Sequence, residues 1–275
     1  MFRFFNALYF IFFAIAFFSC NSDHTGAKDH FNKGIDLLFK EDNTAAKKEF
    51  EAAVTADTSY WQAYFELGSV SLMQGDLQNA MFYYKRTISI NPKFATAYYS
   101  LSNVENLMGD ERASAKENNR ALSLKKDLFL ALLSKCREEY SSSNYKAAIP
   151  DLDTLISLRN DYFIAYGLRG TSKFKNGDFE GAIADFNTEL KMDAKNLTAL
   201  MNRGVALGEL KNYRAAIDDM NEVINLDPKV SQAYLFKGVF LSKINIKDSA
   251  CINFNIAKKL NNPQADSYIK SYCGK

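Results

Sequence analysis

Three features of the 275-residue sequence predict an all-α fold, an α-solenoid of about seven helix–turn–helix units followed by a short C-terminal capping helix. The first is a column of small residues at intervals of 34: Gly34, Gly68, Ser102, Cys136, Gly170, Gly204 and Gly238. The second is a companion column twelve positions later: Ala46, Ala80, Ser114, Ala148, Ala182, Ala216 and Ala250. The third is a turn signal between the columns: Gly75-Asp76, Gly109-Asp110, Ser143-Asn144, Gly177-Asp178 and Asn212-Tyr213. A period of this length is typical of stacked helix pairs. We number the 34-residue intervals cycles one to seven.

Each cycle has the apolar spacing of two amphipathic helices, most clearly in cycle two, residues 61–94. Apolar and small residues recur at helical spacing on both sides of Gly75-Asp76, which should end the first helix and cap the second. Asn91-Pro92 should end the second helix. Where the two helices cross, a side chain larger than Ala would push their axes beyond the usual spacing of about 8–10 Å.

The pattern resembles the tetratricopeptide repeat, W-x2-L-G-x2-Y…A-x3-F…P. In cycle two the residues that carry the resemblance are Tyr64, Leu67, Gly68, Ala80, Tyr84 and Pro92. Cycle five carries it through Tyr166, Gly170, Ala182 and Phe186. The resemblance covers residues 29–264, and cycles six and seven match as well. It implies seven repeats that stack into a right-handed superhelix and bind protein partners on the concave face of the first helices.

Cycles three and four depart from this pattern. Both small positions of cycle three are Ser, and Asn118 stands where an aromatic residue is expected. In cycle four, Pro150 lies about six residues into the second helix, where it removes a backbone hydrogen bond and should kink the helix. We therefore predict that the solenoid is softest or most bent across residues 110–155.

The amino terminus differs from the rest of the chain. Arg3 precedes an unbroken apolar run at positions 7–18, which is short for a membrane span and suits a secretory signal. The run ends in Ser19-Cys20, which resembles a bacterial lipoprotein box. We predict a signal peptide at 1–19, lipidation of Cys20 and a linker at 20–28. An ordinary signal peptide or an uncleaved anchor is the alternative. Asn21 after the cysteine favours the outer over the inner membrane.

The carboxyl terminus should close the stack. Residues 265–275 are expected to form a capping helix whose Tyr268, Ile269 and Tyr272 cover the last repeat. Cys136 occupies the small-residue column and should be buried. Cys251 and Cys273 could form a disulfide in an oxidising compartment, but spacing alone does not decide this.

Helical phase places a mostly apolar row on the face formed by the first helices. The predicted partner-binding groove comprises Phe65, Leu72, Tyr99, Asn103, Leu133, Arg137, Tyr140, Phe174, Met201, Val205 and Leu235. Such a row suits an amphipathic helix or an extended apolar segment, although several members are expected to belong to the core. It has no Lys–Asn pair one turn apart, so the carboxylate clamp that some family members use is not expected.

A second periodic feature pairs basic with acidic residues. The bases just before the small column are Lys33, Lys135, Arg169, Arg203 and Lys237, and sixteen positions later come Glu49, Asp151, Asp185, Asp219 and Asn253. These pairs could form a ladder of ion pairs inside the repeats or a cationic row for an acidic partner. Because each base has its own acidic or polar counterpart, the ladder is the favoured interpretation.

Composition argues against several other functions. Lys and Arg total 34 against 32 Asp and Glu, so no nucleic-acid partner is expected. The two histidines, His24 and His30, fall near the linker, away from any cluster with metal-ligand spacing, and no glycine-rich phosphate loop occurs. We therefore expect neither an enzyme nor a cofactor, metal or small-molecule substrate.

These observations predict a lipid-anchored scaffold or adaptor of the bacterial cell envelope that binds a protein or peptide segment. One alternative is a pilotin-like or assembly lipoprotein that serves an outer-membrane machine, a resemblance of architecture alone. The other is a structural protein that associates with itself.

Overall fold

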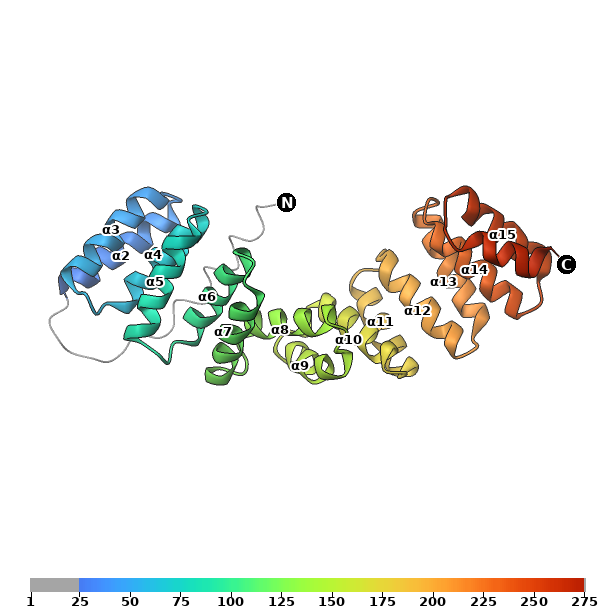
Figure 1. Ribbon diagram of the computed structural model, residues 1–275, viewed down its shortest axis with the longest axis horizontal. Coiled ribbons are helices and arrows are strands. Elements are labelled where there is room, and N and C mark those ends of the chain that lie inside the picture. The colour runs from blue at the N-terminus through green and yellow to red at the C-terminus, as the bar shows by residue number, and fades with distance from the viewer. Residues whose placement is uncertain (1–24, 275) are drawn as a thin grey trace. The chain divides into compact units, whose positions relative to one another are not determined.

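The computed structural model of the protein describes residues 25–274, which fold into two compact units divided between Pro92 and Lys93. Both units consist of helices packed in consecutive pairs, and no strand occurs among the described residues (Figure 1). The predicted signal segment 1–19 and the predicted lipidation site Cys20 lie outside this part of the chain.

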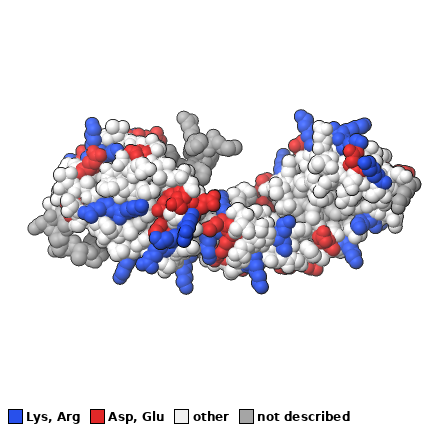
Figure 2. All heavy atoms as spheres, in the orientation of Figure 1, with Lys and Arg blue, Asp and Glu red and all other residues white. Residues whose placement is uncertain are grey.

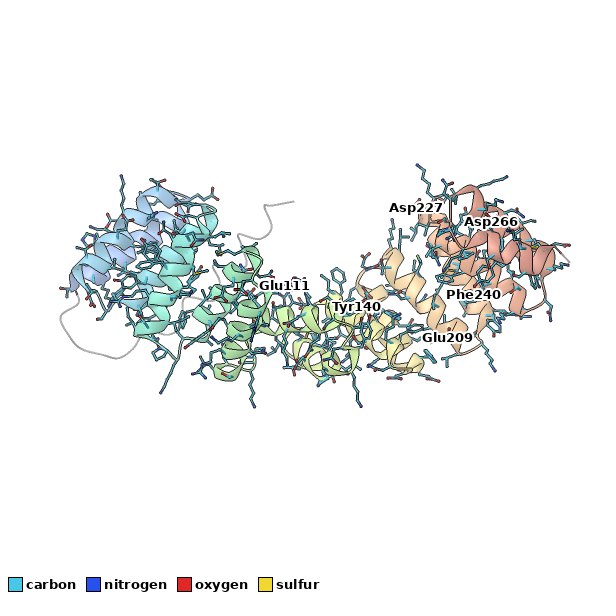
Figure 3. All side chains as sticks on the ribbon, in the orientation of Figure 1. Glu111, Tyr140, Glu209, Asp227, Phe240 and Asp266 are labelled. Carbon is cyan, nitrogen blue, oxygen red and sulfur yellow. A yellow bond between two sulfur atoms is a disulfide. The ribbon has the colours of Figure 1, made fainter. Side chains whose placement is uncertain are left out.

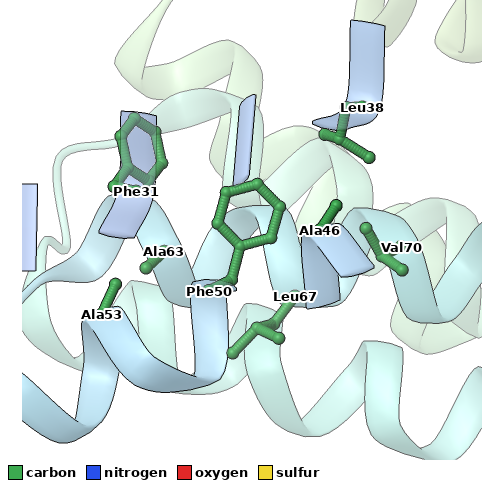
Figure 4. Packing of buried hydrophobic residues seen from close by; sticks show 8 residues of the cluster. All are labelled: Phe31, Leu38, Ala46, Phe50, Ala53, Ala63, Leu67 and Val70. Atoms are coloured by element: carbon green, nitrogen blue, oxygen red, sulfur yellow. The ribbon is translucent and has the colours of Figure 1, made fainter. Parts of the chain in front are cut away.

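The first unit contains cycles one and two. Its helices are α2 (Thr25–Phe39), α3 (Asn43–Ala56), α4 (Trp61–Met73) and α5 (Leu77–Ile90). The α2 helix begins at Thr25, four residues before the predicted start of the repeats at residue 29, so the end of the predicted linker is helical. The core of this unit, shown in Figure 4, comprises Phe31, Leu38, Ala46, Phe50, Ala53, Ala63, Leu67 and Val70.

The second unit contains cycles three to seven and the carboxyl-terminal cap. The first helices of these cycles are α6 (Ala95–Leu107), α8 (Phe129–Ser141), α10 (Phe163–Lys175), α12 (Leu197–Glu209) and α14 (Ser231–Lys243). The second helices are α7 (Glu111–Leu124), α9 (Tyr145–Leu158), α11 (Phe179–Met192), α13 (Tyr213–Leu226) and α15 (Lys247–Lys259). The cap consists of α16 (Ala265–Tyr268) and a π-helical turn, η1 (Ile269–Cys273). Within this unit each helix packs against the next along the chain.

The small column and the residues sixteen positions later share one volume inside each helix pair. A Cβ added at Gly68 would lie 2.6 Å from the Tyr84 ring, and one at Gly170 would lie 2.8 Å from the Phe186 ring. Glycine therefore lets a large side chain of the second helix lie directly on the first helix. Where the column carries a larger residue, the partner is not aromatic: the pairs are Ser102 with Asn118 and Cys136 with Leu152.

The turn between the two helices of a cycle is also periodic. In each cycle one residue of this turn has a positive φ angle: Glu41, Gly75, Gly109, Ser143, Gly177, Lys211 and Asn245. The next residue is the N-cap of the second helix, and in cycles one, two, three and five it is an Asp whose carboxylate accepts a backbone N–H. In cycle six the turn is Lys211-Asn212, one residue earlier than the sequence signal placed it.

Cycles three and four fill their cores differently from the others. The Ser102 and Ser114 hydroxyls lie 3.0 Å apart and hydrogen-bond to each other where the two helices cross. The α7 helix buries only Asn118 and Ala121, whereas the equivalent helix α13 buries Ala216, Asp219, Met220 and Val223. The α9 helix continues through Pro150 to Leu158.

The cap closes the carboxyl-terminal end of the second unit. Cys251 of α15 and Cys273 of η1 form a disulfide with a Cα–Cα distance of 5.8 Å, which settles the pairing that spacing left open. The Tyr268 ring stacks on Phe254 with 5.2 Å between ring centroids, and Tyr272 meets the same ring edge-on. The cap thus covers the apolar side of α15.

Among the residues described, the helices are too short and too polar for any of them to span a bilayer.

Candidate functional site

The paired basic and acidic residues lie inside the helix pairs. Arg203 of α12 donates two hydrogen bonds to Asp219 of α13, with Nε–Oδ2 and Nη2–Oδ1 distances of 3.0 and 2.5 Å. Its third nitrogen, Nη1, donates to the side chain of Asn187 on α11 at 2.7 Å. One guanidinium therefore joins α12 to the second helices of two successive cycles.

Arg169 repeats this arrangement one cycle earlier. It bonds both carboxylate oxygens of Asp185, and its Nη1 lies 2.6 Å from Asp153 on the preceding second helix. The hydrogen bond to Asp185 raises the pKa of the Arg169 guanidinium. Lys135 pairs with Asp151 at 2.6 Å in cycle four. These contacts confirm the ladder for cycles four to six and account for the acidic residues beside each cation.

Cycle one differs from the predicted ladder. Glu49, expected to pair with Lys33, instead lies 2.6 Å from His30 Nδ1. His30, which the sequence puts beside the linker, belongs to α2 and lies on the face of this helix that meets α3. The thiol of Cys136 is buried in the core of cycle four, and this burial raises its pKa to about 12.

An apolar pocket opens on the side of the second unit formed by the first helices. Its volume is about 190 Å³, and it is lined by Thr171, Phe174 and Lys175 of α10, Phe186 of α11, Met201, Asn202 and Val205 of α12, and Phe236 of α14. Phe186 is buried, and the other seven side chains are partly or fully exposed. Lys175 Nζ lies 5.9 Å from the centre of the Phe174 ring. The pocket thus combines an apolar lining with one hydroxyl, one amide and one cation.

Three of the predicted groove residues meet at this pocket: Phe174, Met201 and Val205. Phe65, Leu133 and Leu235 are only 2, 7 and 1% exposed, so they are part of the core rather than of an accessible surface. Leu235 packs in the cluster that the cap closes. The remaining members, Leu72, Tyr99, Asn103, Arg137 and Tyr140, are at least partly exposed but lie on α4, α6 and α8, outside the pocket. Tyr140, labelled in Figure 3, has its ring edge-on to that of Tyr145.

The pocket residues that the sequence row lacked have two origins. Lys175, Asn202 and Phe236 directly follow the predicted residues Phe174, Met201 and Leu235, and Thr171 lies one helical turn before Phe174, so the stripe of residues that faces the pocket is wider than one residue per turn. Phe186 comes from a second helix, and the aromatic column could have signalled it. Phe240, labelled in Figure 3, lies against Gly208, where an added Cβ would meet its ring. This contact brings α14 close to α12.

A buried carboxylate lies one helical turn from the pocket. Glu189 of α11 is 7% exposed, and its Oε1 accepts a hydrogen bond from Asn196 Nδ2 at 3.1 Å. Desolvation, with a smaller contribution from the charge of Asp193, raises the pKa of Glu189 to about 7. A Cβ added at Gly167 of α10 would lie 2.7 Å from both carboxylate oxygens. The carboxylate therefore fills space that a side chain at position 167 would need.

No group of three or more His, Cys, Asp or Glu residues with metal-binding geometry occurs in residues 25–274. On the face seen in Figure 2, basic and acidic side chains are interspersed, with no large area of one sign.

Helix pairs that recur every 34 residues define the chain as a helical repeat protein. The profile of the family described as "Tetratricopeptide repeat" matches residues 31–95 and 168–231. The chain is thus a tetratricopeptide-repeat protein. This fold supports protein–protein interaction scaffolds, and proteins built from it are generally non-catalytic.

Solved structures show the same fold at low sequence identity. The C-terminal part of a repeat-containing protein from Cytophaga hutchinsonii is 12% identical, with a TM-score of 0.65 over 86% of this chain and 98% of that one. YrrB, a repeat protein described as having an unusual peptide-binding site, is 19% identical, with a TM-score of 0.62 over 67% of this chain and 95% of YrrB. PilF of Pseudomonas aeruginosa is 17% identical, with a TM-score of 0.57 over 80% and 99%. No curated protein sequence matches the chain significantly.

Proposed function

We propose that this protein is a lipid-anchored scaffold of the bacterial envelope that binds an apolar segment of a partner protein in the pocket formed by α10, α12 and α14. The observation that carries the proposal is the pocket itself, because Phe174, Met201 and Phe236 present partly exposed apolar surface there. Its volume of about 190 Å³ is below the range of about 300–1,000 Å³ typical of small-molecule sites and suits one or two side chains.

The ladder supports a binding role by making the pocket rigid. Arg169 and Arg203 join the first helices α10 and α12 to the second helices on either side of each. A preformed site loses less conformational entropy when a ligand binds, so more of the contact energy appears as affinity. The likeness to YrrB is one of fold, and it makes a peptide the first ligand to test.

Affinity capture from detergent-solubilised membranes tests the pocket. Wild type is compared with Phe174→Ala/Met201→Ala and with a matched control, Phe82→Ala, whose phenyl ring is 60% exposed on α5. We expect the pocket variant to lose partners that wild type and control both retain, and circular dichroism should show that all three are folded. Recovery of the same partners by all three would refute binding in the pocket.

Membrane attachment rests on the sequence of the amino terminus alone. Cys20→Ala should move the protein from the membrane to the soluble fraction, and mass spectrometry of the wild-type amino terminus should find acyl chains on Cys20. An unchanged distribution together with an unmodified cysteine would remove lipidation from the proposal. A pilotin-like role is a narrower form of the same proposal, and the partners captured would distinguish it.

Self-association is the rival from a different class of function. Light scattering on wild type over a hundredfold concentration range should give a constant monomer mass if the pocket serves another protein. A mass that rises with concentration in wild type, and not in the pocket variant, would instead identify a second copy of this chain as the occupant.

A further inference from the structure

Cycle five departs from the repeat pattern at two positions that meet in space. Glu189 stands where the other second helices carry Ala53, Thr87, Ala121, Leu155, Val223 and Ala257, all of them buried. Gly167 stands where the other first helices carry Phe31, Phe65, Tyr99, Leu133, Met201 and Leu235. An acidic residue has replaced a small or aliphatic one, and the large side chain that would cover it is missing.

The two departures form one site. The Glu189 carboxylate lies over the Gly167 backbone, since an added Cβ there would be 2.7 Å from both oxygens. Asn196 holds Oε1 in place while its own Oδ1 accepts the backbone N–H of Ala199 and caps α12. The second oxygen, Oε2, accepts no hydrogen bond from any residue between 25 and 274 and is still reached by solvent. A carboxylate that is nine-tenths buried therefore keeps an unused acceptor.

The site lies next to the pocket along α10 and α11. Phe186, which lines the pocket from α11, lies three residues before Glu189 on the same helix, so the two side chains project from adjacent turns. Thr171, which lines the pocket from α10, lies four residues after Gly167 and therefore on the same helical face. The carboxylate thus lies one helical turn along the groove between α10 and α12.

We infer that the partner segment places an apolar side chain in the pocket and a Lys or Arg side chain between α10 and α12, where its head group donates to Glu189 Oε2. This inference rests on the proposed function, because the pocket anchors the segment. Lys and Arg have long apolar stems that can cross apolar surface while their charge reaches an acceptor. A cation at Glu189 would compensate for the contacts with water that the carboxylate loses on burial. Charge-assisted hydrogen bonds of this kind are about twice as strong as neutral ones.

A phage-displayed library of random dodecapeptides tests the inference on the full chain. Selection on wild type should enrich peptides with an apolar residue and, at a fixed spacing from it, Lys or Arg. The best such peptide is then synthesised with Lys and with norleucine at that position. Glu189→Gln, which keeps the shape of the side chain and an acceptor for Asn196, should weaken binding of the Lys peptide at least about tenfold and change the norleucine peptide less than about twofold.

The outcomes separate the two claims. Enriched apolar peptides without a basic residue, or a Lys peptide that is insensitive to Glu189→Gln, would overturn the inference and leave the pocket proposal standing. Failure of Phe174→Ala/Met201→Ala to abolish selection would overturn both. A third variant, Gly167→Met, introduces the residue that cycle six carries at this position and should weaken binding of the Lys peptide by displacing the carboxylate, because its Cβ would lie 2.7 Å from both oxygens. Thermal unfolding of each variant shows that the protein under test is folded.

Discussion

Cycles three and six pack the crossing of their two helices with different kinds of side chain, polar in cycle three and apolar in cycle six. At the crossing of their two helices, cycle six has Gly204 facing Met220, whereas cycle three has Ser102 facing Ser114. In place of the methionine, cycle three has Asn118, whose Nδ2 donates to the Ala131 carbonyl at 2.9 Å and whose Oδ1 is buried without a partner among the described residues. Both cycles form a helix pair, so the backbone arrangement does not depend on an apolar crossing.

The difference lies in how much each pair contributes to stability. In a stack of repeats, stability is approximately the sum of the repeats and of the interfaces between neighbours. A hydrogen bond contributes about 0.5–1.5 kcal/mol net, and an unpaired buried acceptor costs about 1–3 kcal/mol. In place of the apolar contacts of Met220, Asn118 makes one hydrogen bond and leaves one such acceptor. The second unit should therefore have a weak region near α7 and a strong region near α13.

Truncation of the equivalent side chains should show this difference most strongly. Met220→Ala removes a fully buried side chain and should lower the free energy of unfolding by about 2–5 kcal/mol. Asn118→Ala removes one hydrogen bond and also one unpaired oxygen, so this variant should lower the free energy of unfolding by about 1 kcal/mol or less. Urea denaturation of both variants measures the difference. Equal losses would mean that the two cores are equally well packed.

The ion pairs give the next largest contrast. Arg203→Ala leaves the Asp219 carboxylate, whose side chain is 7% exposed, without its bidentate partner and should cost about 2–4 kcal/mol. The acidic residue that cycle three has at this position, Glu117, pairs instead with Lys116, whose side chain is 81% exposed, and Lys116→Ala should change stability by no more than about 0.5 kcal/mol. A double-mutant cycle with Asp219→Ala should show coupling above about 1 kcal/mol. Additive effects would contradict the ladder.

Glu189 makes cycle five sensitive to pH. Its pKa is about 7 in the folded protein against an ordinary value of 4.5, so the folded state binds more protons between these values. Stability should then fall as pH rises from about 4.5 to 7, by about 1–2 kcal/mol after allowance for solvent screening. Glu189→Gln should be more stable than wild type by this amount at pH 8 and equal to it near pH 4.

The difference between wild type and variant is the informative quantity. Burial also raises the pKa of Glu66 to about 7, and that residue contributes equally to both proteins. Glu180→Gln, on the exposed first turn of the same helix, is the matched control and should show no such pH-dependent gain. If the free energies of unfolding of Glu189→Gln and wild type differ by the same amount at every pH, Glu189 is not the source of the pH dependence.

Hydrogen exchange compares the two regions without mutation. Amides of residues 110–155 should exchange about tenfold faster than those of residues 195–260, because a difference of about 1.4 kcal/mol in opening free energy corresponds to that factor. Uniform protection across the second unit would show that the polar crossing of α6 and α7 does not lower the local stability of cycle three.

Conversion of cycle three to the pattern of its neighbours should give the smallest effect. Asn118→Phe alone should be neutral or destabilising, because Ser102 carries a Cβ where the aromatic cycles carry glycine. Ser102→Gly/Asn118→Phe should be more stable than Asn118→Phe alone, by about 1 kcal/mol, despite the intrinsic cost of glycine in a helix. The comparison of single and double variants tests whether the two columns share one volume.

The period of 34 residues predicted the helix pairs, the turns and the ion pairs of cycles four to six, because each depends on contacts inside one repeat. Features that depend on stacking were harder to predict. The second partners of Arg169 and Arg203, Asp153 and Asn187, lie sixteen residues before them on the neighbouring cycle. Whether Leu235 or Phe236 faces the pocket depends on the cap, and whether Cys251 reaches Cys273 depends on three-dimensional geometry.

A linear array of repeats ordinarily frays from its two ends, since a terminal repeat has only one neighbour. The disulfide between Cys251 and Cys273 links the last turn of this protein covalently to α15, so the cap cannot separate from the last repeat while the bond is intact. Unfolding of the second unit should then start away from the carboxyl terminus, nearer to α7. In a reducing environment that constraint is lost, and the order in which the repeats open should change without any change in sequence.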